Sequence, residues 1–270
     1  MGLMDGKTVL VFGVANKNSI AWGISRKLHA EGAEIALSYA TPKLESRVRG
    51  LGEQIGSTFI EPCDVSSDEE IERLFAAYEE RYEKLDGLVH SIGYAPREDM
   101  GGPFRDVSRE GFRIALDISA YSLIPLTRHS MPLMRDGGSV IALSYYAAEK
   151  VVPAYNVMAV AKAALECEVR YLAAELGTRG IRVNAISAGP IRTLAATGID
   201  NFKSLHGVAR EIAPLRRDIT TEDVGNTALW LMSDLGAATT GDTIYADGGY
   251  HSLGVTIPDS LKPDWLTFPE

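Results

Sequence analysis

The chain has 270 residues, of which 46% are hydrophobic and 23% charged, and this composition is ordinary for globular proteins with a large buried core. The net charge of −9 argues against nonspecific nucleic-acid binding, and the absence of a long apolar run or signal-peptide core predicts a cytoplasmic protein outside the membrane. The only cysteines, Cys63 and Cys167, form no C-x-x-C pair, so neither a disulfide framework nor a zinc site is indicated.

Short apolar runs alternate with helical patterns along the whole chain. We expect strands at 8–12, 34–38, 57–61, 87–91, 139–143, 182–187 and 243–246, and helices at 19–31, 43–53, 68–82, 155–176 and 222–235. The strand runs are continuously apolar, as in parallel sheets covered on both faces. This pattern predicts an α/β fold: one domain over residues 1–270, built on a doubly wound parallel sheet of seven strands with helices on both faces.

Two segments interrupt the alternation, each just after the carboxyl end of a strand. They are residues 94–103, rich in Gly and Pro, and residues 189–217, which are long and mixed. Open α/β sheets bind ligands at this edge, so we expect 189–217 to be the substrate-binding loop. Ile199, Phe202 and Leu205 stand at helical spacing and predict a short amphipathic helix within 194–205 that closes over the site.

The connection after the first strand has the character of a phosphate-binding turn. Gly13 ends the strand, and the free N–H groups of the following helix would face an anion. The spacing G-x-G-x-x-G is absent, because Ser19 and Ala21 stand where stricter patterns have glycine. A strand-turn-helix connection without a ligand is therefore the alternative.

Residues after the later strands refine this interpretation. The segment 38–43 has neither an acid nor an Arg, and Lys43 is its first base, which favours NAD over NADP. Asp64 could accept a hydrogen bond from an adenine amino group or cap the helix that begins nearby. Gly93, which follows Ser91 and Ile92, would let the backbone approach a ribose, or it simply ends the strand.

Tyr155 and Lys162 are seven residues apart, which places both on one face of a helix, roughly 10 Å apart along its axis. An ammonium near a phenol favours the phenolate, and a phenol so placed can donate to a carbonyl oxygen that gains negative charge. This chemistry suits a carbonyl or enoyl reductase. The structural alternative is a packing tyrosine and a surface lysine.

Taken together, these motifs resemble the short-chain dehydrogenase/reductase superfamily, which has the Rossmann fold. Within it, the chain is similar to the bacterial NADH-dependent enoyl-acyl-carrier-protein reductases of type II fatty acid synthesis. Classical members carry Tyr-x-x-x-Lys, whereas here Ala159 follows Tyr155 at that distance and the lysine is Lys162. The resemblance covers nearly the whole chain and rests on residues 13–23, 63–65, 90–93, 117–119 and 187–196, with Tyr145, Tyr155 and Lys162.

The resemblance implies a role for each site residue. Tyr155 would hydrogen-bond the thioester carbonyl oxygen, Tyr145 would assist as a second donor, and Lys162 would bind the nicotinamide ribose. NAD, as NADH, would be held by Gly13, Ser19, Ile20, Asp64, Val65, Ile92, Lys162, Ile191, Arg192, Thr193, Leu194 and Ala195. The substrate would contact Tyr94, Ala95, Met158, Ala196, Ile199 and Phe202.

The family resemblance also implies a homotetramer and an acyl carrier protein that brings the enoyl thioester. Relatives are thought to meet the acidic carrier through bases beside the substrate loop, but here residues 199–206 contain one clear base, Lys203. Docking would then shift toward Arg210, Arg216 and Arg217.

Two other functions remain as alternatives. A ketoreductase of the same superfamily is disfavoured by Ala159 and by Asp117, which stands where classical members place a catalytic asparagine. A non-catalytic dinucleotide-binding regulator would have no need for Tyr155 and Lys162 together.

Overall fold

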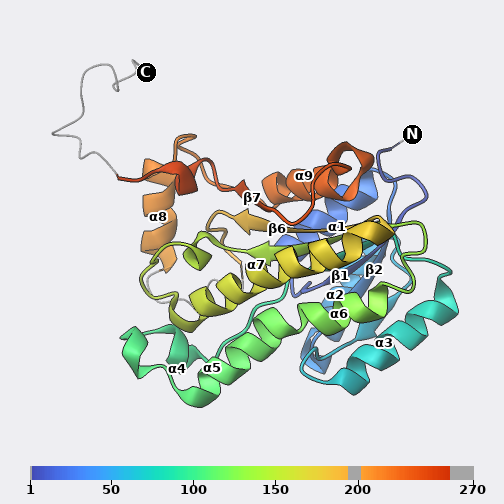
Figure 1. Cartoon of the computed structure of the whole chain (residues 1–270), viewed down its shortest axis with the longest axis horizontal. Helices are drawn as coiled ribbons and strands as arrows, with labels where there is room; N and C mark the ends of the chain where they lie inside the picture. Colours follow the sequence, from blue (N-terminus) through green and yellow to red (C-terminus); the bar gives the residue numbers. More distant parts are fainter. Residues whose placement is uncertain (1, 194–201, 256–270) are drawn as a thin grey trace.

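The computed structural model describes residues 2–193 and 202–255, and its centre is a sheet in which every pairing is parallel (Figure 1). The order is β3-β2-β1-β4-β5-β6-β7, so the chain moves outward in one direction, returns to the middle and continues in the other. The predicted doubly wound sheet of seven strands is confirmed. The strands are β1 Thr8–Phe12, β2 Glu34–Tyr39, β3 Ile60–Pro62, β4 Gly87–His90, β5 Gly138–Ser144, β6 Ile181–Ala188 and β7 Thr243–Ala246.

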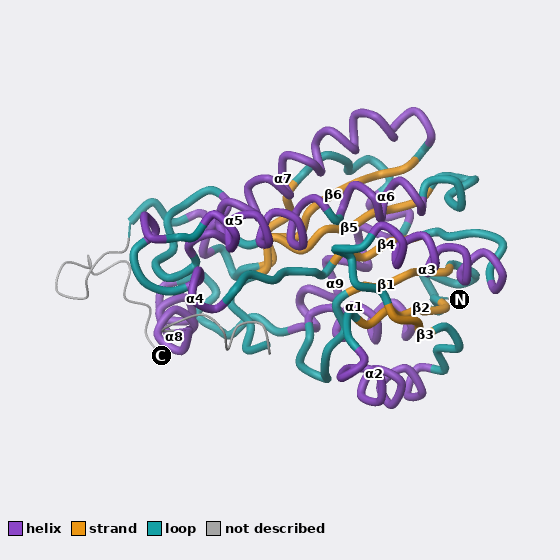
Figure 2. The backbone as a smooth tube through the Cα atoms, turned by 90° about the horizontal axis from the view of Figure 1, so that it is seen from below, coloured by secondary structure: helices purple, strands orange, loops and turns teal. Residues whose placement is uncertain are grey.

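Helices cover both faces of this sheet (Figure 2). One face packs against α1 (Ile20–Ala30), α2 (Glu45–Gly52) and α9 (Thr221–Met232). The other packs against α3 (Asp68–Arg81), α6 (Leu123–Ser130) and α7 (Asn156–Leu176). Each layer has its own cluster of buried aliphatic side chains, which explains why the strands carry apolar residues on both faces.

The segment between β4 and β5 is more helical than the sequence pattern indicated. It contains α4 (Arg97–Met100), α5 (Arg109–Leu116) and a π-helical turn, Asp117–Tyr121, that leads into α6. Ser108 caps α5 by accepting a hydrogen bond from the Gly111 N–H at 2.9 Å. A serine before a charged and apolar stretch is the signal that could have predicted this helix.

The predicted helix within 194–205 is only partly covered by the structure. Helix α8 spans Phe202–Ile212 and so begins inside that range. Leu194, Ala195, Ala196 and Ile199, and the side chain of Phe202, lie outside the described residues. Among the described residues, no helix is long and apolar enough to cross a membrane, and no group of His, Cys, Asp and Glu is arranged to hold a metal ion.

Candidate active site

The turn after β1 is shaped by Gly13 and Ser19. Gly13 has φ of +97°, and a Cβ there would lie 2.0 Å from the Ser91 carbonyl oxygen, so only glycine fits between β1 and β4. Ser19 Oγ accepts hydrogen bonds from the N–H groups of Ala15 and Asn16, at 3.1 and 3.0 Å. Ser19 thus folds the turn back on itself instead of capping α1, which has no side-chain cap. The uncapped N-terminus, starting at Ile20, fits a phosphate group.

Asp64 organises the turn after β3. Its Oδ1 accepts hydrogen bonds from the Ser66 N–H and Oγ at 3.0 and 2.7 Å, while Ser67 caps α3 by accepting from the Glu70 N–H. The helix-capping alternative for Asp64 is therefore wrong. The residue remains exposed, and the neighbouring Val65 is buried, which together suit the edge and the face of a purine ring.

Lys162 is buried and points from α7 toward the ends of β4 and β5. Its Nζ donates to the carbonyl oxygens of Leu143 at 2.7 Å and Ile92 at 3.1 Å. A Cβ at Gly93 would lie 3.7 Å from Nζ, an ordinary contact distance, so Gly93 lies beside the ammonium. The surface-lysine alternative is wrong, because Lys162 is only 6% exposed.

Burial governs the electrostatics around this lysine. It lowers the pKa of Lys162 from 10.5 to about 8, while the charge of Glu166 acts in the opposite direction. Burial, helped by the Lys162 charge, also lowers the pKa of His90 to about 3. His90 is therefore neutral, with its Nε2 at 2.8 Å from Ser122 Oγ.

Tyr145 and Tyr155 face each other with ring centroids 4.8 Å apart. Burial, and then the neighbouring Tyr145, raises the pKa of Tyr155 above its ordinary value, and burial raises that of Tyr145 as well. The expectation that Lys162 would favour the phenolate is therefore wrong, because burial disfavours the anion. The helix begins at Asn156, one residue later than predicted, with Tyr155 at its N-cap in a helical backbone conformation.

A small apolar cluster packs against Tyr155 and contains two of the predicted substrate residues. Ala95 and Met158 are buried in it, and Tyr155 packs against it, whereas Tyr94 is 55% exposed. Ser119, in the π-helical turn, clamps the Tyr94 backbone: its Oγ accepts from the Tyr94 N–H at 2.9 Å and donates to the Tyr94 carbonyl at 3.0 Å. The sequence pattern assigned no role to Ser119.

Asn156 is a second residue that the sequence analysis missed. Its Nδ2 donates to the carbonyls of Gly101 and Gly102 at 2.9 and 3.1 Å, and so ties the start of α7 to the loop after β4. Asn156 has φ of +38°, a conformation that asparagine tolerates better than most residues. Its position directly after Tyr155 is the one feature of the sequence that could have indicated a role for Asn156 at this site.

The loop after β6 approaches the same edge of the sheet. Ile191 packs against the core, Arg192 is exposed, and the Thr193 N–H donates to the Ile191 carbonyl at 2.8 Å. These residues stand as predicted beside the carboxyl end of β6, and the rest of the predicted covering segment lies outside the described residues.

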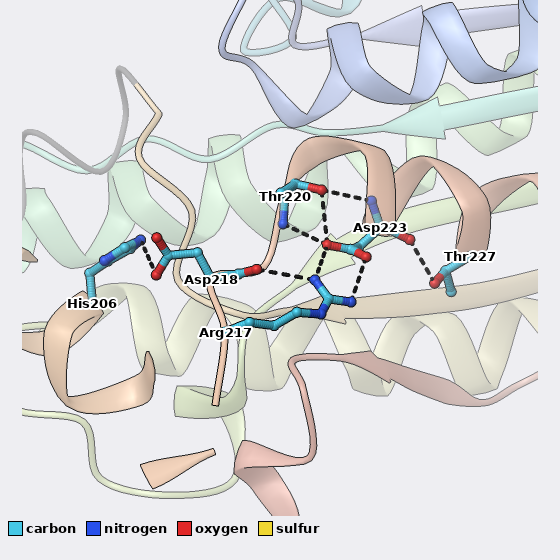
Figure 3. Close-up of polar contacts among 6 residues, drawn as sticks. All are labelled: His206, Arg217, Asp218, Thr220, Asp223 and Thr227. Carbon is cyan, nitrogen blue, oxygen red and sulfur yellow. Dashed lines mark hydrogen bonds and ion pairs between the residues drawn. The ribbon is translucent and has the colours of Figure 1, made fainter. Parts of the chain in front are cut away.

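Polar contacts surround the segment between α8 and α9 (Figure 3). His206, buried on α8, has Nε2 3.6 Å from Asp218 Oδ1. Arg217 binds both carboxylate oxygens of Asp223 at 2.8 Å, and Asp223 forms a capping box with Thr220 at the start of α9. Arg217, one of the bases expected at the carrier surface, is therefore already paired.

Comparisons with known proteins identify the family of this chain. The family model described as "Enoyl-(Acyl carrier protein) reductase" matches residues 13–251. The enoyl-(acyl-carrier-protein) reductase (NADH) FabI of Aquifex aeolicus is 54% identical over 256 residues, or 94% of this chain and 95% of that protein. FabI of Escherichia coli is 47% identical over 251 residues, or 93% of this chain and 96% of that protein.

Solved structures give the same result. The A. aeolicus reductase superposes with a TM-score of 0.91 over 94% of this chain and all of that chain. The enoyl-(acyl-carrier-protein) reductase of Anaplasma phagocytophilum in complex with NAD is 46% identical, with a TM-score of 0.92 over 95% of this chain and 98% of that one. The chain belongs to the enoyl-(acyl-carrier-protein) reductase family.

Proposed function

We propose that this protein is an enoyl-(acyl-carrier-protein) reductase that uses NADH to reduce the trans-2 double bond of enoyl thioesters in type II fatty acid biosynthesis. The observation that carries the proposal is the grouping of two facing tyrosines with a buried lysine at the carboxyl edge of the sheet. The chain would act as one dinucleotide-binding reductase domain, with residues 189–217 as its substrate loop.

The residues at this edge fit a dinucleotide. The uncapped start of α1 suits the pyrophosphate, Asp64 and Val65 suit the adenine, and Lys162, fixed by the Ile92 carbonyl, suits the nicotinamide ribose. When bound, NADH supplies the hydride that adds to the β-carbon of the enoyl thioester. The loop after β6, from Ile191 to Thr193, would lie over the same cofactor.

The chain's own residues stabilise the charge that hydride addition creates. Negative charge develops on the thioester carbonyl oxygen, and Tyr155, kept neutral by its raised pKa, donates a hydrogen bond to it. Tyr145 lies close enough to Tyr155 to serve as a second donor. Lys162, which is buried beside this site, contributes a positive charge.

The surroundings of β2 support NADH as the preferred cofactor. Tyr39 ends the strand, and the next base, Lys43, is exposed. Arg47 reaches back toward the phosphate turn, with Nη1 3.5 Å from the Ala15 carbonyl, and it is the base best placed to permit some use of NADPH.

For the partners, we infer an acyl carrier protein and further copies of this chain. Arg210 and Arg216 are exposed and free of the pairing that occupies Arg217 in the described structure, so they suit an acidic carrier. Arg210→Glu should raise KM for carrier-bound substrate and leave KM for the coenzyme A thioester unchanged.

Helix α7 exposes Tyr171 beside Ala163 and Ala174, a face suited to close packing in a cytoplasmic homotetramer, which light scattering would detect.

NADH oxidation with two thioesters tests the function and its alternatives. The proposed reductase oxidises NADH with a crotonyl thioester and is inactive with an acetoacetyl thioester. A ketoreductase would show the reverse preference. A non-catalytic regulator would turn over neither substrate.

A further inference from the structure

Helix α7 carries a second buried ionisable residue one turn after Lys162. Glu166 is only 7% exposed, and its Oε1 accepts a hydrogen bond from Ser144 Oγ at 2.5 Å. A carboxylate is costly to bury, so its retention at this position calls for a reason. The reductase chemistry described above makes no use of Glu166.

The hydrogen bond between Ser144 and Glu166 joins α7 to the carboxyl end of β5. Ser144 is the last residue of β5 and lies between Leu143, whose carbonyl accepts from Lys162, and Tyr145, which faces Tyr155. By holding Ser144, Glu166 fixes the backbone that presents both neighbours to the site. A shift of that strand end would move the Lys162 ammonium and the second phenol together.

Glu166 also balances the charge of Lys162. The two contacts that Lys162 makes in the described structure are with neutral carbonyls, and no carboxylate in the described ranges forms an ion pair with it. Glu166 lies four residues further along α7, where side chains of one helix face are neighbours. Burial lowers the pKa of Lys162, and the negative charge of Glu166 raises it.

The other charged and titratable groups around this pair come from α7, β4, β7 and the segment after β5. Burial raises the pKa of Glu166, and the hydrogen bond from Ser144 opposes that rise. The charge of Glu149, which follows β5, also raises this pKa, whereas the charges of Arg170, on α7 itself, and of Lys162 lower it. Tyr245, on β7, donates a hydrogen bond to Glu149. Burial raises the pKa of Tyr245, and the charge of Glu166 adds to that rise. His90, on β4, is neutral, so it adds no charge beside Lys162.

We propose that Glu166 is a positioning residue of the reductase site, which holds the end of β5 through Ser144 and supplies the counter-charge that keeps Lys162 an ammonium. It touches neither substrate nor cofactor and acts through Ser144 and Lys162. Only the expected effect of Glu166 on catalysis rests on the proposed function. The charge coupling is a property of the folded protein without ligands.

The direct test is an NMR titration of Lys162 in wild type and Glu166→Gln, with the signal assigned from Lys162→Met. Gln keeps the volume and the acceptor oxygen for Ser144 but removes the charge. The wild-type midpoint should lie near pH 8. In Glu166→Gln it should fall by about one pH unit, as expected for a charge several ångströms away in a partly buried site.

Glu168→Gln is the matched control. Glu168 lies on the same helix, and burial alone raises its pKa to about 7. The charge of Glu168 does not contribute to the pKa of Lys162. Glu168 Oε2 is buried without a hydrogen-bond partner in the described structure. The Lys162 midpoint should be the same in Glu168→Gln as in wild type.

A second pair of variants tests the hydrogen bond separately. Ser144→Ala should lower kcat with crotonyl thioester by about fivefold, and Ser144→Thr, which keeps the hydroxyl, should restore most of it. This pair also decides the strand-holding role if Glu166→Gln fails to fold. Equal kcat in wild type and Ser144→Ala would remove the strand-holding role.

The charge-balancing role is overturned if the Lys162 midpoint is unchanged in Glu166→Gln, or if Glu168→Gln moves it as far. Failure of the proposed function looks different. In that case the wild type would not reduce crotonyl thioester, while the NMR midpoints could still differ as expected.

Discussion

Tyr155 and Tyr145 are placed as neutral hydrogen-bond donors, since both phenols are held at raised pKa values by burial. Tyr155→Phe keeps the ring and its packing but removes the donor, so kcat should fall by about 10²–10³, as for the loss of one oxyanion donor. Tyr145→Phe should cost less, because Tyr155 remains. Steady-state rates measure both, and an equal NADH dissociation constant in each variant would show that the cofactor site is intact.

A Tyr155→Phe enzyme as fast as wild type would remove Tyr155 from the mechanism. If Tyr145→Phe were the slower variant, the two tyrosines would exchange roles.

The charge of Lys162 predicts how activity depends on pH. Its pKa in the folded protein is lowered to about 8, so the ammonium is complete below that pH and is lost as the pH rises through it. Both kcat/KM and NADH affinity should therefore decline above about pH 8. Fluorescence titration of NADH at a series of pH values measures the binding part, and affinity that stays constant from pH 7 to pH 10 would contradict it.

At the scale of elements, the π-helical turn before α6 holds the loop after β4. Ser119 clamps the Tyr94 backbone with two hydrogen bonds. Ser119→Ala should loosen the loop and raise KM for the enoyl thioester by about fivefold to tenfold, while the NADH dissociation constant stays unchanged.

Ser122→Ala is the control for this prediction. Ser122 is a buried serine of the same segment that bonds His90 and the Ile118 carbonyl instead of the loop. If both variants raised KM equally, the effect would come from general destabilisation of the segment and not from the clamp.

The start of α9 depends on a charged contact beside α8. Arg217, assisted by Thr220, lowers the pKa of Asp223 below its ordinary value of 3.8 (Figure 3). A carboxyl group whose pKa falls on folding stabilises the protein above its unfolded pKa and loses that effect as the pH falls through the folded value. Asp223→Asn should therefore cost about 1–2 kcal/mol of unfolding free energy at pH 7.

Urea unfolding at several pH values tests this prediction. The difference from wild type should be constant above about pH 5 and shrink below pH 4. Glu222→Gln, an adjacent acid without an ion pair in the described structure, should cost less. A difference that is independent of pH would show that the Asp223 charge is unimportant.

Features that depend on neighbouring residues in the sequence could be predicted, and features that depend on distant contacts could not. The strands are continuous apolar runs, which is a local signal, so the sheet was predicted correctly. Glycine at position 13 is required by the close approach of Ser91, a residue distant in the sequence. The π-helical turn that contains Ser119 was not predicted, and it packs against α7, which is distant in the sequence. The direction of the Tyr155 pKa depends on burial, which spacing along the sequence does not reveal.

For the molecule as a whole, the order of the strands explains where the site forms. The chain leaves β1 in one direction toward β3 and crosses back to β4, so β1 and β4 are neighbours whose connections diverge at their carboxyl ends. That divergence opens the edge at which Gly13, Ile92 and Lys162 meet. Loops after β4 and β6 then add the substrate side, and the sheet itself remains a rigid support.

The most direct test of the reductase is the position of the transferred hydrogen. The protein is incubated with crotonyl thioester and NADH that carries deuterium at nicotinamide C4 on the transferred face, and the product is analysed by NMR and mass spectrometry. We predict a saturated butyryl thioester with one deuterium at the β-carbon, because Tyr155 and Lys162 stabilise charge at the carbonyl oxygen and hydride adds to the conjugate position. Unchanged crotonyl thioester, or deuterium at the carbonyl carbon, would contradict the account.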